Sequence, residues 1–312
     1  MKGKPAVSVE LLEAITSGLL ASRQPNASTA SRCLSGPALR RLLVELRTSA
    51  GKRQPSADVL IGHLVRAQIL QPLEIEKESR KSPSELYLIG PDVASTVHPI
   101  ELLSAAVPGG VACYFTAMSF YSLTTQHPPH HHIARLRADS TSAARVHIRP
   151  GGETHGAPAA PSYDVLGTHL FSRGGLAYYV TSRSARWMPG VKSRFLHSTA
   201  CIRITSLEQT LIDSLHRSLS CGGPPVIFEA WATALDEPLA DVEELERLIL
   251  AIGDDRVARR VAYMLDVHGC DVPGGVLALI ETARTRAEFN VLPLFPGYDG
   301  GSVDQHLQLR VP

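Results

Sequence analysis

Four histidines in the stretch QHPPHHHIARL are the residues with the clearest capacity for chemistry: His127, His130, His131 and His132. Histidine is the commonest metal ligand in proteins, and His130 and His132 would share one face of a strand. A zinc site normally needs a third protein ligand at a suitable spacing, and no H-E-x-x-H, H-x-E or C-x-x-C element supplies it. We therefore interpret the stretch as a polar turn between a helix and a strand. A metal-dependent enzyme built on these histidines is the alternative.

Patterns for phosphate binding and for nucleophilic catalysis are missing. The glycine pairs in PGGETHG and SCGGPP lack the G-x-x-x-x-G-K-[ST] and G-x-G-x-x-G spacings that cradle phosphates. No G-x-S-x-G turn occurs, and Glu208 and Asp213 are five residues apart, so their carboxylates diverge on a helix. We predict that the chain is not an enzyme, and we predict no metal and no other cofactor.

The cysteines argue against a disulfide framework. They are odd in number, widely spread and form no C-x-x-C pair: Cys33, Cys113, Cys201, Cys221 and Cys270. This pattern predicts reduced, structural thiols.

The charge of the chain is unevenly distributed. Over 312 residues the net charge is only +1, but residues 1–90 contain 13 Lys and Arg against 8 Asp and Glu, which gives +5. The remainder contains 18 against 22, which gives −4. A basic N-terminal third on an acidic body predicts a polyanionic partner at one end.

The hydropathy of the sequence predicts a cytoplasmic protein without a membrane partner. No run of about eighteen apolar residues is present, and the first ten residues lack the apolar core of a signal peptide. The length and the ordinary composition, with 44% hydrophobic and 20% charged residues, predict a folded chain of two domains.

The first third has the element order of a winged helix-turn-helix. Apolar residues recur at helical spacing over 9–20, from about 37 to 46 and over 55–65. The stretch LEIEKESRKSPSELYLIG then reads as two half-buried strands, with Leu73 and Ile75 on the first and Leu86 and Leu88 on the second, joined by a polar tip. In this motif the third helix enters the major groove, and the hairpin forms the wing. We assign it to residues 1–92.

Candidate DNA-contacting residues follow from this layout. Cations before the third helix, at its end and on the wing can reach phosphates: Lys52, Arg53, Arg66, Lys77, Arg80 and Lys81. Polar residues on or near the helix can reach base edges: Gln54, Ser56 and His63. Glu74, Glu76 and Glu78 count against DNA binding unless they face away from it. A module that docks a protein partner is the alternative.

Residues 93–312 are predicted to form a mixed α/β domain with a helical C-terminal part, so the fold class is α+β. Two helices and a strand follow Pro91, with Thr116 as a helix cap. Strands are predicted in ARVHI, GTHLF, LAYYV and ACIRI, and helices return from Thr205, where Ser206 and Gln209 have capping-box spacing. The alternation of Leu307, Leu309 and Val311 predicts a last strand.

Two further cationic groups lie in this second part. Basic residues interspersed with Trp187 and Phe195 suit either nucleic-acid binding or a charged edge strand, and we favour the edge strand: Arg183, Arg186, Lys192, Arg194 and Arg203. A second group is interpreted as one face of an amphipathic helix whose N-terminus carries Asp254 and Asp255: Arg256, Arg259 and Arg260.

Three segments between 112 and 270 resemble AbiEi-type antitoxins. The run from Ser122 to Pro128 is similar to the family's G-L-T-x-Q-x-P helix end, with serine for glycine. The stretch TSLEQTLID resembles its T-S-x-E-R-T-[LIV]-[LIV]-D segment, with Gln209 for arginine. ARRVAYMLD is similar to its R-R-L-G-Y-L-L-E helix, with Ala262 for glycine.

The resemblance implies a transcriptional regulator of an abortive-infection, type IV toxin–antitoxin system. Such a protein binds inverted repeats in double-stranded DNA upstream of its own operon through an N-terminal winged helix and represses transcription, with two copies on the DNA as a dimer or cooperatively. Its C-terminal domain counters a nucleotidyltransferase-like toxin, generally without a stable complex.

Overall fold

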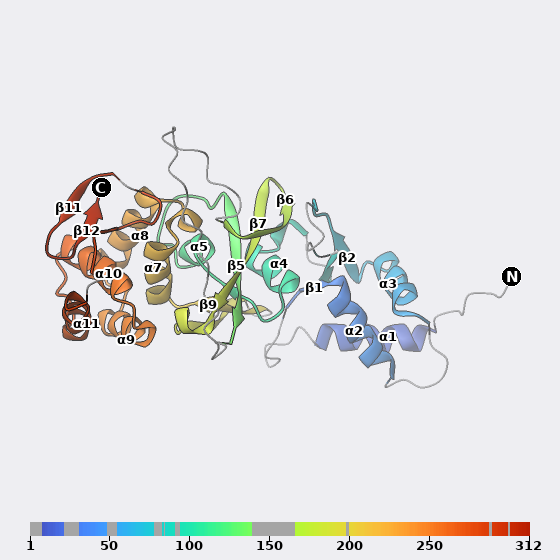
Figure 1. The fold of residues 1–312 in the computed structure, drawn as a ribbon. Helices are drawn as coiled ribbons and strands as arrows, with labels where there is room; N and C mark the ends of the chain where they lie inside the picture. The colour runs from blue at the N-terminus through green and yellow to red at the C-terminus, as the bar shows by residue number, and fades with distance from the viewer. Residues whose placement is uncertain are drawn as a thin grey trace.

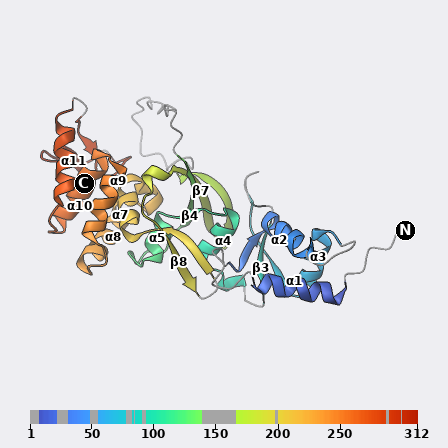
Figure 2. The same cartoon turned by 90° about the horizontal axis from the view of Figure 1, so that it is seen from below.

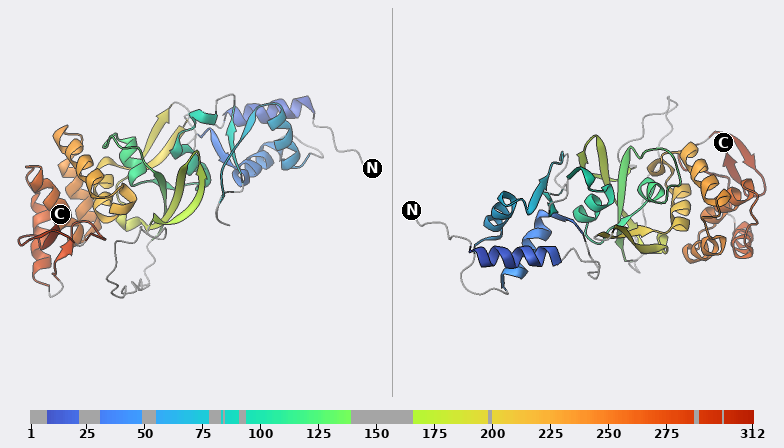
Figure 3. Two further views of the ribbon diagram at one scale, coloured as in Figure 1. Left: turned by 90° about the horizontal axis from the view of Figure 1, so that it is seen from above. Right: turned by 180° about the vertical axis from the view of Figure 1, so that it is seen from behind.

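A computed structural model of the chain describes residues 8–21, 31–48, 55–77, 83, 85–90, 94–138, 166–197, 200–286, 289–298 and 300–312. They form an elongated α+β molecule with a small N-terminal head, a central sheet and a helical C-terminal part (Figure 1). We call described residues 8–90 the head and described residues 94–312 the body. The views from below, above and behind place α1 and β12 at opposite ends of the long axis (Figures 2 and 3).

The head contains three helices and a three-stranded sheet. In chain order its elements are α1 (Val9–Ala21), β1 (Cys33–Ser35), α2 (Gly36–Thr48), α3 (Ala57–Arg66), β2 (Leu70–Leu73) and β3 (Leu86–Ile89). The three predicted helices and the strand pair are confirmed. Strand β1 is an addition, and it pairs antiparallel with β3, which pairs antiparallel with β2 on its other side.

Strand β3 is buried on both faces, so the prediction of a half-buried strand is wrong. Tyr87 and Ile89 belong to the head core, together with residues of all three helices. Leu86 and Leu88 point the other way, into a cluster that also contains α4 and the body sheet. The alternation in the sequence is hidden because every residue of β3 is apolar, as expected for a central strand packed on both sides.

The body is built on a mixed six-stranded sheet in the order β6-β7-β5-β4-β9-β8. Its elements are α4 (Pro99–Ala106), β4 (Val111–Ala112), α5 (Phe115–Phe120), β5 (His130–Arg137), β6 (Thr168–Arg173), β7 (Leu176–Ser184), β8 (Val191–His197) and β9 (Ala200–Thr205). Strand β4 runs parallel to β9, and β5 runs parallel to β7, while the other neighbours are antiparallel. Helix α4 packs on one face of the sheet and α5 on the other (Figure 1).

Two local predictions for the body are wrong. The three consecutive histidines do not form a turn, because they open strand β5 in the interior of the sheet. Thr116 does not cap a helix, because it lies inside α5 and its hydroxyl accepts a hydrogen bond from the amide of His132 at 2.7 Å. The strand predicted in ARVHI lies outside the described residues.

Helices return after β9, as predicted, and pack around Trp231. They are α7 (Leu207–His216), α8 (Pro224–Asp236), α9 (Val242–Ile252), α10 (Asp255–Val267) and α11 (Gly274–Arg284). The predicted last strand is β12 (Leu309–Val311), which lies between β10 (Leu292–Pro293) and β11 (Ser302–Asp304). Among the described residues, none of these helices is long and apolar enough to cross a bilayer.

Head and body are joined by three kinds of contact. Arg32 donates two hydrogen bonds to Glu101 of α4, from Nε at 3.0 Å and from Nη2 at 2.7 Å. The backbones of Glu76 and Ser172 exchange two hydrogen bonds of 2.9 Å, so the chain after β2 extends the body sheet beyond β6. The apolar cluster around Leu86 and Leu88 crosses the same boundary. The head is therefore held in one orientation on the body.

Candidate nucleic-acid interface

Helix α3 is held at its start by a cap and along one side by the head core. Ser56 is the N-cap residue, and its hydroxyl accepts a hydrogen bond from the amide of Val59 at 3.4 Å. Leu60 and Leu64 are fully buried against α1 and α2. Since these leucines are four residues apart on one face, the opposite face of α3 must point out of the head.

The outward face of α3 consists of Val59, Gly62, His63 and Arg66, which follow the helical repeat. The first three are half-buried, and Arg66 is exposed. A Cβ atom built on Gly62 would meet nothing within 4 Å, so the helix backbone is open to a ligand at this point. Arg66 makes no hydrogen bond or ion pair within the described part of the chain.

An ion-pair chain fixes the N-terminal end of α3 to the rest of the head. Arg40 of α2 contacts Asp58 Oδ1 through Nε at 2.8 Å and Glu85 Oε2 through Nη2 at 3.1 Å. The hydrogen bond that Arg40 donates to Asp58 is the largest cause of the raised pKa of Arg40. Arg47 donates to the carbonyl oxygen of Pro55 at 3.1 Å. Two cations of α2 therefore position the first turn of α3, and the carboxylate of Asp58 is already paired.

The predicted wing is anchored to the body just after its first strand. The backbone of Glu76 pairs with that of Ser172 in β6. The chain is therefore fixed to the body at the residue before Lys77, which is exposed. Glu74 and Glu76 are both exposed. Two of the three acidic residues that count against DNA binding are therefore at the surface, at the base of the wing, and Glu78 lies outside the described residues.

The structure describes four of the nine predicted DNA-contacting residues: Ser56, His63, Arg66 and Lys77. Ser56 is the N-cap of α3, and His63 and Arg66 lie in its last two turns, so these three residues are spread along the length of the helix. Ser56 also has the capping role that its prediction as a base-reading residue did not include. Five lie outside the described residues: Lys52, Arg53, Gln54, Arg80 and Lys81.

The net positive charge of the first 90 residues is carried by residues outside the described part of the chain. Described residues of this region contain 6 Lys and Arg against 7 Asp and Glu, a net charge of −1. The other residues of this region contain 7 Lys and Arg and 1 Glu, a net charge of +6. The two values sum to the total of +5. Four of these cations belong to the segments that lead into α3 and follow Lys77: Lys52, Arg53, Arg80 and Lys81.

Reasoning from the sequence missed Gly62 and Arg40. Gly62 lies inside a helix without a turn or cap to explain it, and glycine there is unfavourable by about 0.5–1 kcal/mol relative to alanine. That cost is a detectable sign of a close approach. Arg40 gave no such sign, because its partners Asp58 and Glu85 are 18 and 45 residues away.

The first cationic group of the body is largely occupied by internal contacts. Arg183 pairs with Asp213 at 3.4 Å, Arg186 donates to the carbonyl of Ile252 at 3.2 Å, and Arg203 donates to the carbonyl of Gly109 at 2.6 Å. Strand β8, which carries Lys192 and Arg194, is the edge strand of the sheet. The interpretation as a charged edge strand is confirmed for β8.

The second cationic group is more buried than an amphipathic surface would be. Arg259 is 2% exposed, donates to the carbonyl of Asn290 at 3.0 Å and lies 4.4 Å from the ring centre of Phe289. Arg260 is also buried and donates to the carbonyl of Pro293 at 3.1 Å. These two arginines tie α10 to the C-terminal sheet, so the predicted solvated face is wrong for both.

The histidines of β5 pack in an aromatic cluster. His132 is fully buried, stacks on Tyr179 at 5.3 Å and meets Tyr114 edge-on at 5.4 Å. Burial lowers the pKa of His132 to about 3 and that of His131 to about 4, so both are neutral at pH 7. No group of three His, Cys, Asp or Glu side chains in the described residues is arranged to hold a metal ion.

Asp213 is the most perturbed carboxyl group of the body. It is 1% exposed, and burial raises its pKa to about 6, while Arg183 and Gln209 act in the opposite sense. Gln209 donates to its Oδ1 at 3.1 Å and to the carbonyl of Trp187, and accepts from the amide of Gly190. Because Gln209 is used in this way, Ser206 caps α7 without a reciprocal bond.

The five cysteines are free thiols.

Comparison with known proteins gives a distant likeness among solved structures. No protein-family profile matches the chain, and no curated protein matches it. Among solved structures, the RV2827C protein from Mycobacterium tuberculosis is similar at 17% sequence identity and a TM-score of 0.49, over 99% of this chain and 94% of that chain. A likeness at this level says nothing about function.

Proposed function

We propose that the chain is a sequence-specific DNA-binding autorepressor and the antitoxin of an abortive-infection, type IV toxin–antitoxin system, acting in the cytoplasm. Residues 1–92 form its winged helix-turn-helix in this proposal, with α3 as the recognition helix and the β2–β3 pair as the wing. The element order α-β-α-α-β-β of the head supports this assignment, because β1 and the hairpin together make the small sheet of such a motif.

The observation that carries the proposal is the open face of α3. Leu60 and Leu64 occupy the inward face, while Gly62 and Arg66 lie on the outward face with free space and an unpaired guanidinium in the described residues. A protein that reads the major groove needs one helix presented in this way, with cations near both of its ends. Lys52 and Arg53 precede this helix in the sequence, and Arg66 is at its end.

The antitoxin role depends on the resemblance to AbiEi-type proteins and on the separate body. In this proposal the body counters a nucleotidyltransferase-like toxin, and two copies of the chain occupy an inverted repeat, since palindromic sites match two-fold protein symmetry. Stable complex formation with the toxin is not required.

Binding of the purified full-length chain to labelled DNA from upstream of its own gene tests the DNA-binding half. Scrambled DNA of the same length is the control, and both are titrated at several salt concentrations. The expected result is preference for the native DNA and a log affinity that falls linearly with log salt, since phosphate contacts release counterions. Equal weak binding to both DNAs overturns sequence-specific repression and favours docking of a protein partner.

Co-expression tests the antitoxin half separately. A neighbouring nucleotidyltransferase-like gene, if toxic alone, is expected to lose toxicity with the wild-type chain. A variant with Gly62→Glu is expected to protect equally when both genes are expressed from foreign promoters, because only the head is altered. Toxicity that persists with the wild-type chain contradicts the antitoxin role and leaves the DNA-binding result standing.

A further inference from the structure

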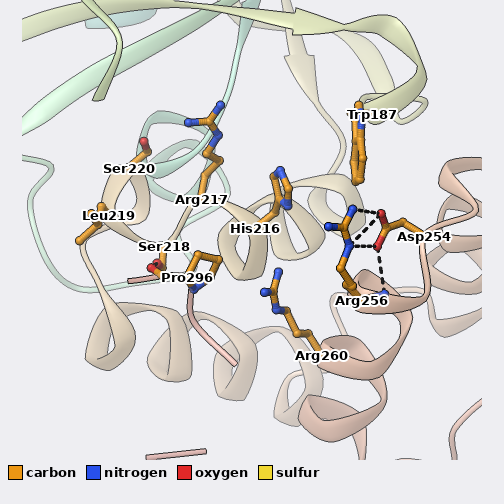
Figure 4. A pocket seen from close by; sticks show the side chains of 10 residues that line it. All are labelled: Trp187, His216, Arg217, Ser218, Leu219, Ser220, Asp254, Arg256, Arg260 and Pro296. Carbon is orange, nitrogen blue, oxygen red and sulfur yellow. Dashed lines mark hydrogen bonds and ion pairs between the residues drawn. The ribbon is translucent and has the colours of Figure 1, made fainter. Parts of the chain in front are cut away.

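A charged hollow lies in the body, far along the chain from the head. It has a volume of about 340 Å³ and forms where the end of α7, the short helix Ser218–Cys221 and the start of α10 meet (Figure 4). Trp187 and Pro296 complete its wall. This volume is within the range of about 300–1,000 Å³ that is typical of small-molecule sites.

The side chains around the hollow carry an excess of positive charge. Three arginines, Arg217, Arg256 and Arg260, line it against the single carboxylate of Asp254, which gives a net charge of +2. Arg256 is paired with Asp254, with Nε at 3.0 Å from Oδ1 and Nη2 at 2.5 Å from Oδ2. Neither of the other two arginines makes an ion pair within 4 Å among the described residues, although Arg217 acts on the buried carboxyl of Asp213 and Asp254 acts on Arg260.

Arg260 and Arg217 are available to an anion. Arg260 uses Nε for the carbonyl of Pro293, which leaves its two terminal nitrogens directed into the hollow (Figure 4). Burial lowers its pKa to about 10, so it remains protonated at pH 7. Arg217 is half-buried, and its guanidinium makes no hydrogen bond to any described residue. Desolvation of a buried cation is unfavourable, and a bound anion would relieve this cost.

An aromatic wall stands on the other side of the hollow. The ring of half-buried Trp187 stacks on His216, with the ring centres 5.0 Å apart and the planes at 18°. Burial and the neighbouring arginines lower the pKa of His216 to about 3, so the imidazole adds no charge at pH 7. A flat aromatic surface beside guanidinium groups suits a ligand that has a planar ring and an anionic group, because bases stack on aromatic side chains and arginines bind phosphate through paired N–H groups.

We infer that this hollow binds a nucleoside phosphate. Arg260 holds the phosphate with its two terminal nitrogens, Arg217 adds positive charge to the lining, and the Trp187–His216 wall supports the base. The inference is independent of DNA binding by the head, because the hollow shares no residue with the head. It gives the body a ligand of its own, through which a free nucleotide can act on the protein.

Tryptophan fluorescence of the full-length chain measures this binding directly. The sequence contains two tryptophans, and Trp231 is fully buried, so a ligand in the hollow acts on Trp187. AMP, CMP, GMP and UMP are titrated in turn, with adenosine and inorganic phosphate as partial ligands. The expected result is saturable quenching by at least one nucleotide, at least about tenfold tighter than either partial ligand, since both subsites contribute.

Variants identify the hollow as the site. Arg217→Gln is expected to weaken nucleotide binding at least about tenfold, because it removes one of the positive charges that line the hollow. Arg247→Gln on α9 is the matched control, since Arg247 is an exposed arginine that does not line the hollow, and it leaves the affinity unchanged. Arg260→Lys, read by calorimetry, retains charge without the planar fork and weakens binding as well.

Three results would overturn the inference. They are the absence of saturable binding by all four nucleotides, an unchanged affinity in both Arg217→Gln and Arg260→Lys, or binding of inorganic phosphate as tightly as any nucleotide. Circular dichroism of each variant confirms that it is folded before its affinity is compared.

Discussion

Substitutions at Gly62 can test the stability of α3 separately from access to its outward face. Gly62→Ala is expected to raise the free energy of unfolding by about 0.5–1 kcal/mol, because alanine favours the helix and nothing lies within 4 Å of the new Cβ. Gly62→Glu keeps the helix but puts a long anionic side chain on the side that faces DNA in our proposal. We expect it to weaken DNA binding at least about tenfold, since like charges across an interface cost several kcal/mol.

Urea unfolding and DNA titration of the two glycine variants give the measurement. If Gly62→Glu binds the upstream DNA as tightly as Gly62→Ala, α3 is not the helix that enters the groove.

In our proposal Arg66 contacts a phosphate of the DNA, so its loss is expected to change the salt dependence of DNA binding. Arg66→Gln is expected to weaken binding to native and scrambled DNA alike, and to reduce the slope of log affinity against log salt by about one. Arg41→Gln is the control, because Arg41 is an exposed arginine of α2 that borders a hollow between head and body instead. A change of base preference at constant slope would assign Arg66 to base reading.

At the scale of elements, the central strand β3 packs against the head core on one face and against the apolar cluster shared with the body on the other. Leu88 is fully buried in the cluster shared with α4 and β6, so Leu88→Ala is expected to cost about 2–5 kcal/mol. Both tryptophans lie in the body, while far-UV circular dichroism also reports the head helices. We expect the unfolding midpoints of both signals to fall together in Leu88→Ala. In Leu60→Ala, which alters only the head core, the tryptophan midpoint is expected to change less.

The helices were predictable because each has a one-sided apolar repeat within its own sequence. Strand β1 was not predictable from the sequence. Its three residues, directly before Gly36 and Pro37, are too few to show a repeat, and they pair with Leu86–Leu88, about 53 residues later in the sequence. The histidines of β5 were misread for the same reason. Their polar character indicates a turn, while the rings that bury His132, those of Tyr114 and Tyr179, come from α5's N-terminus and from β7.

The candidate interface was predictable in position but not in detail. Charge and element order pointed to α3 and the wing, because both are properties of a short stretch of sequence. The anchoring of the wing at Glu76 and the pairing of Asp58 with Arg40 depend on β6 and α2, which only the folded chain brings to these residues.

At the scale of the whole molecule, the pair Arg32–Glu101 decides how firmly the head sits on the body. Glu101 is 1% exposed, accepts from Arg32 and from the amide of His98, and lies 3.3 Å from Nε2 of His197. Burial raises its pKa, but these hydrogen bonds outweigh burial and leave the pKa below its ordinary value. A carboxyl group whose pKa is lowered by folding stabilises the folded state above its unfolded pKa of about 4.3. That contribution is lost as the pH falls through the lower, folded value.

The variant Glu101→Gln therefore has a pH-dependent effect. At pH 7 it is expected to lower the free energy of unfolding by about 3 kcal/mol, because it leaves the buried Arg32 without its counter-charge. As the pH falls below the unfolded pKa of about 4.3 and through the lower pKa of folded Glu101, the difference between the two proteins shrinks toward zero. Urea unfolding of both proteins at several pH values measures the difference.

A matched control separates the buried pair from general acid effects. Glu281→Gln removes a carboxylate that is 59% exposed and paired within α11, so its effect is expected to stay within about 0.5 kcal/mol at every pH. If Glu101→Gln shows the same small and constant difference, the ion pair does not hold the head. The orientation of α3 on the body then depends on the backbone bridge at Glu76 and on the apolar cluster around Leu88 alone, and Glu101→Gln would leave DNA affinity unchanged.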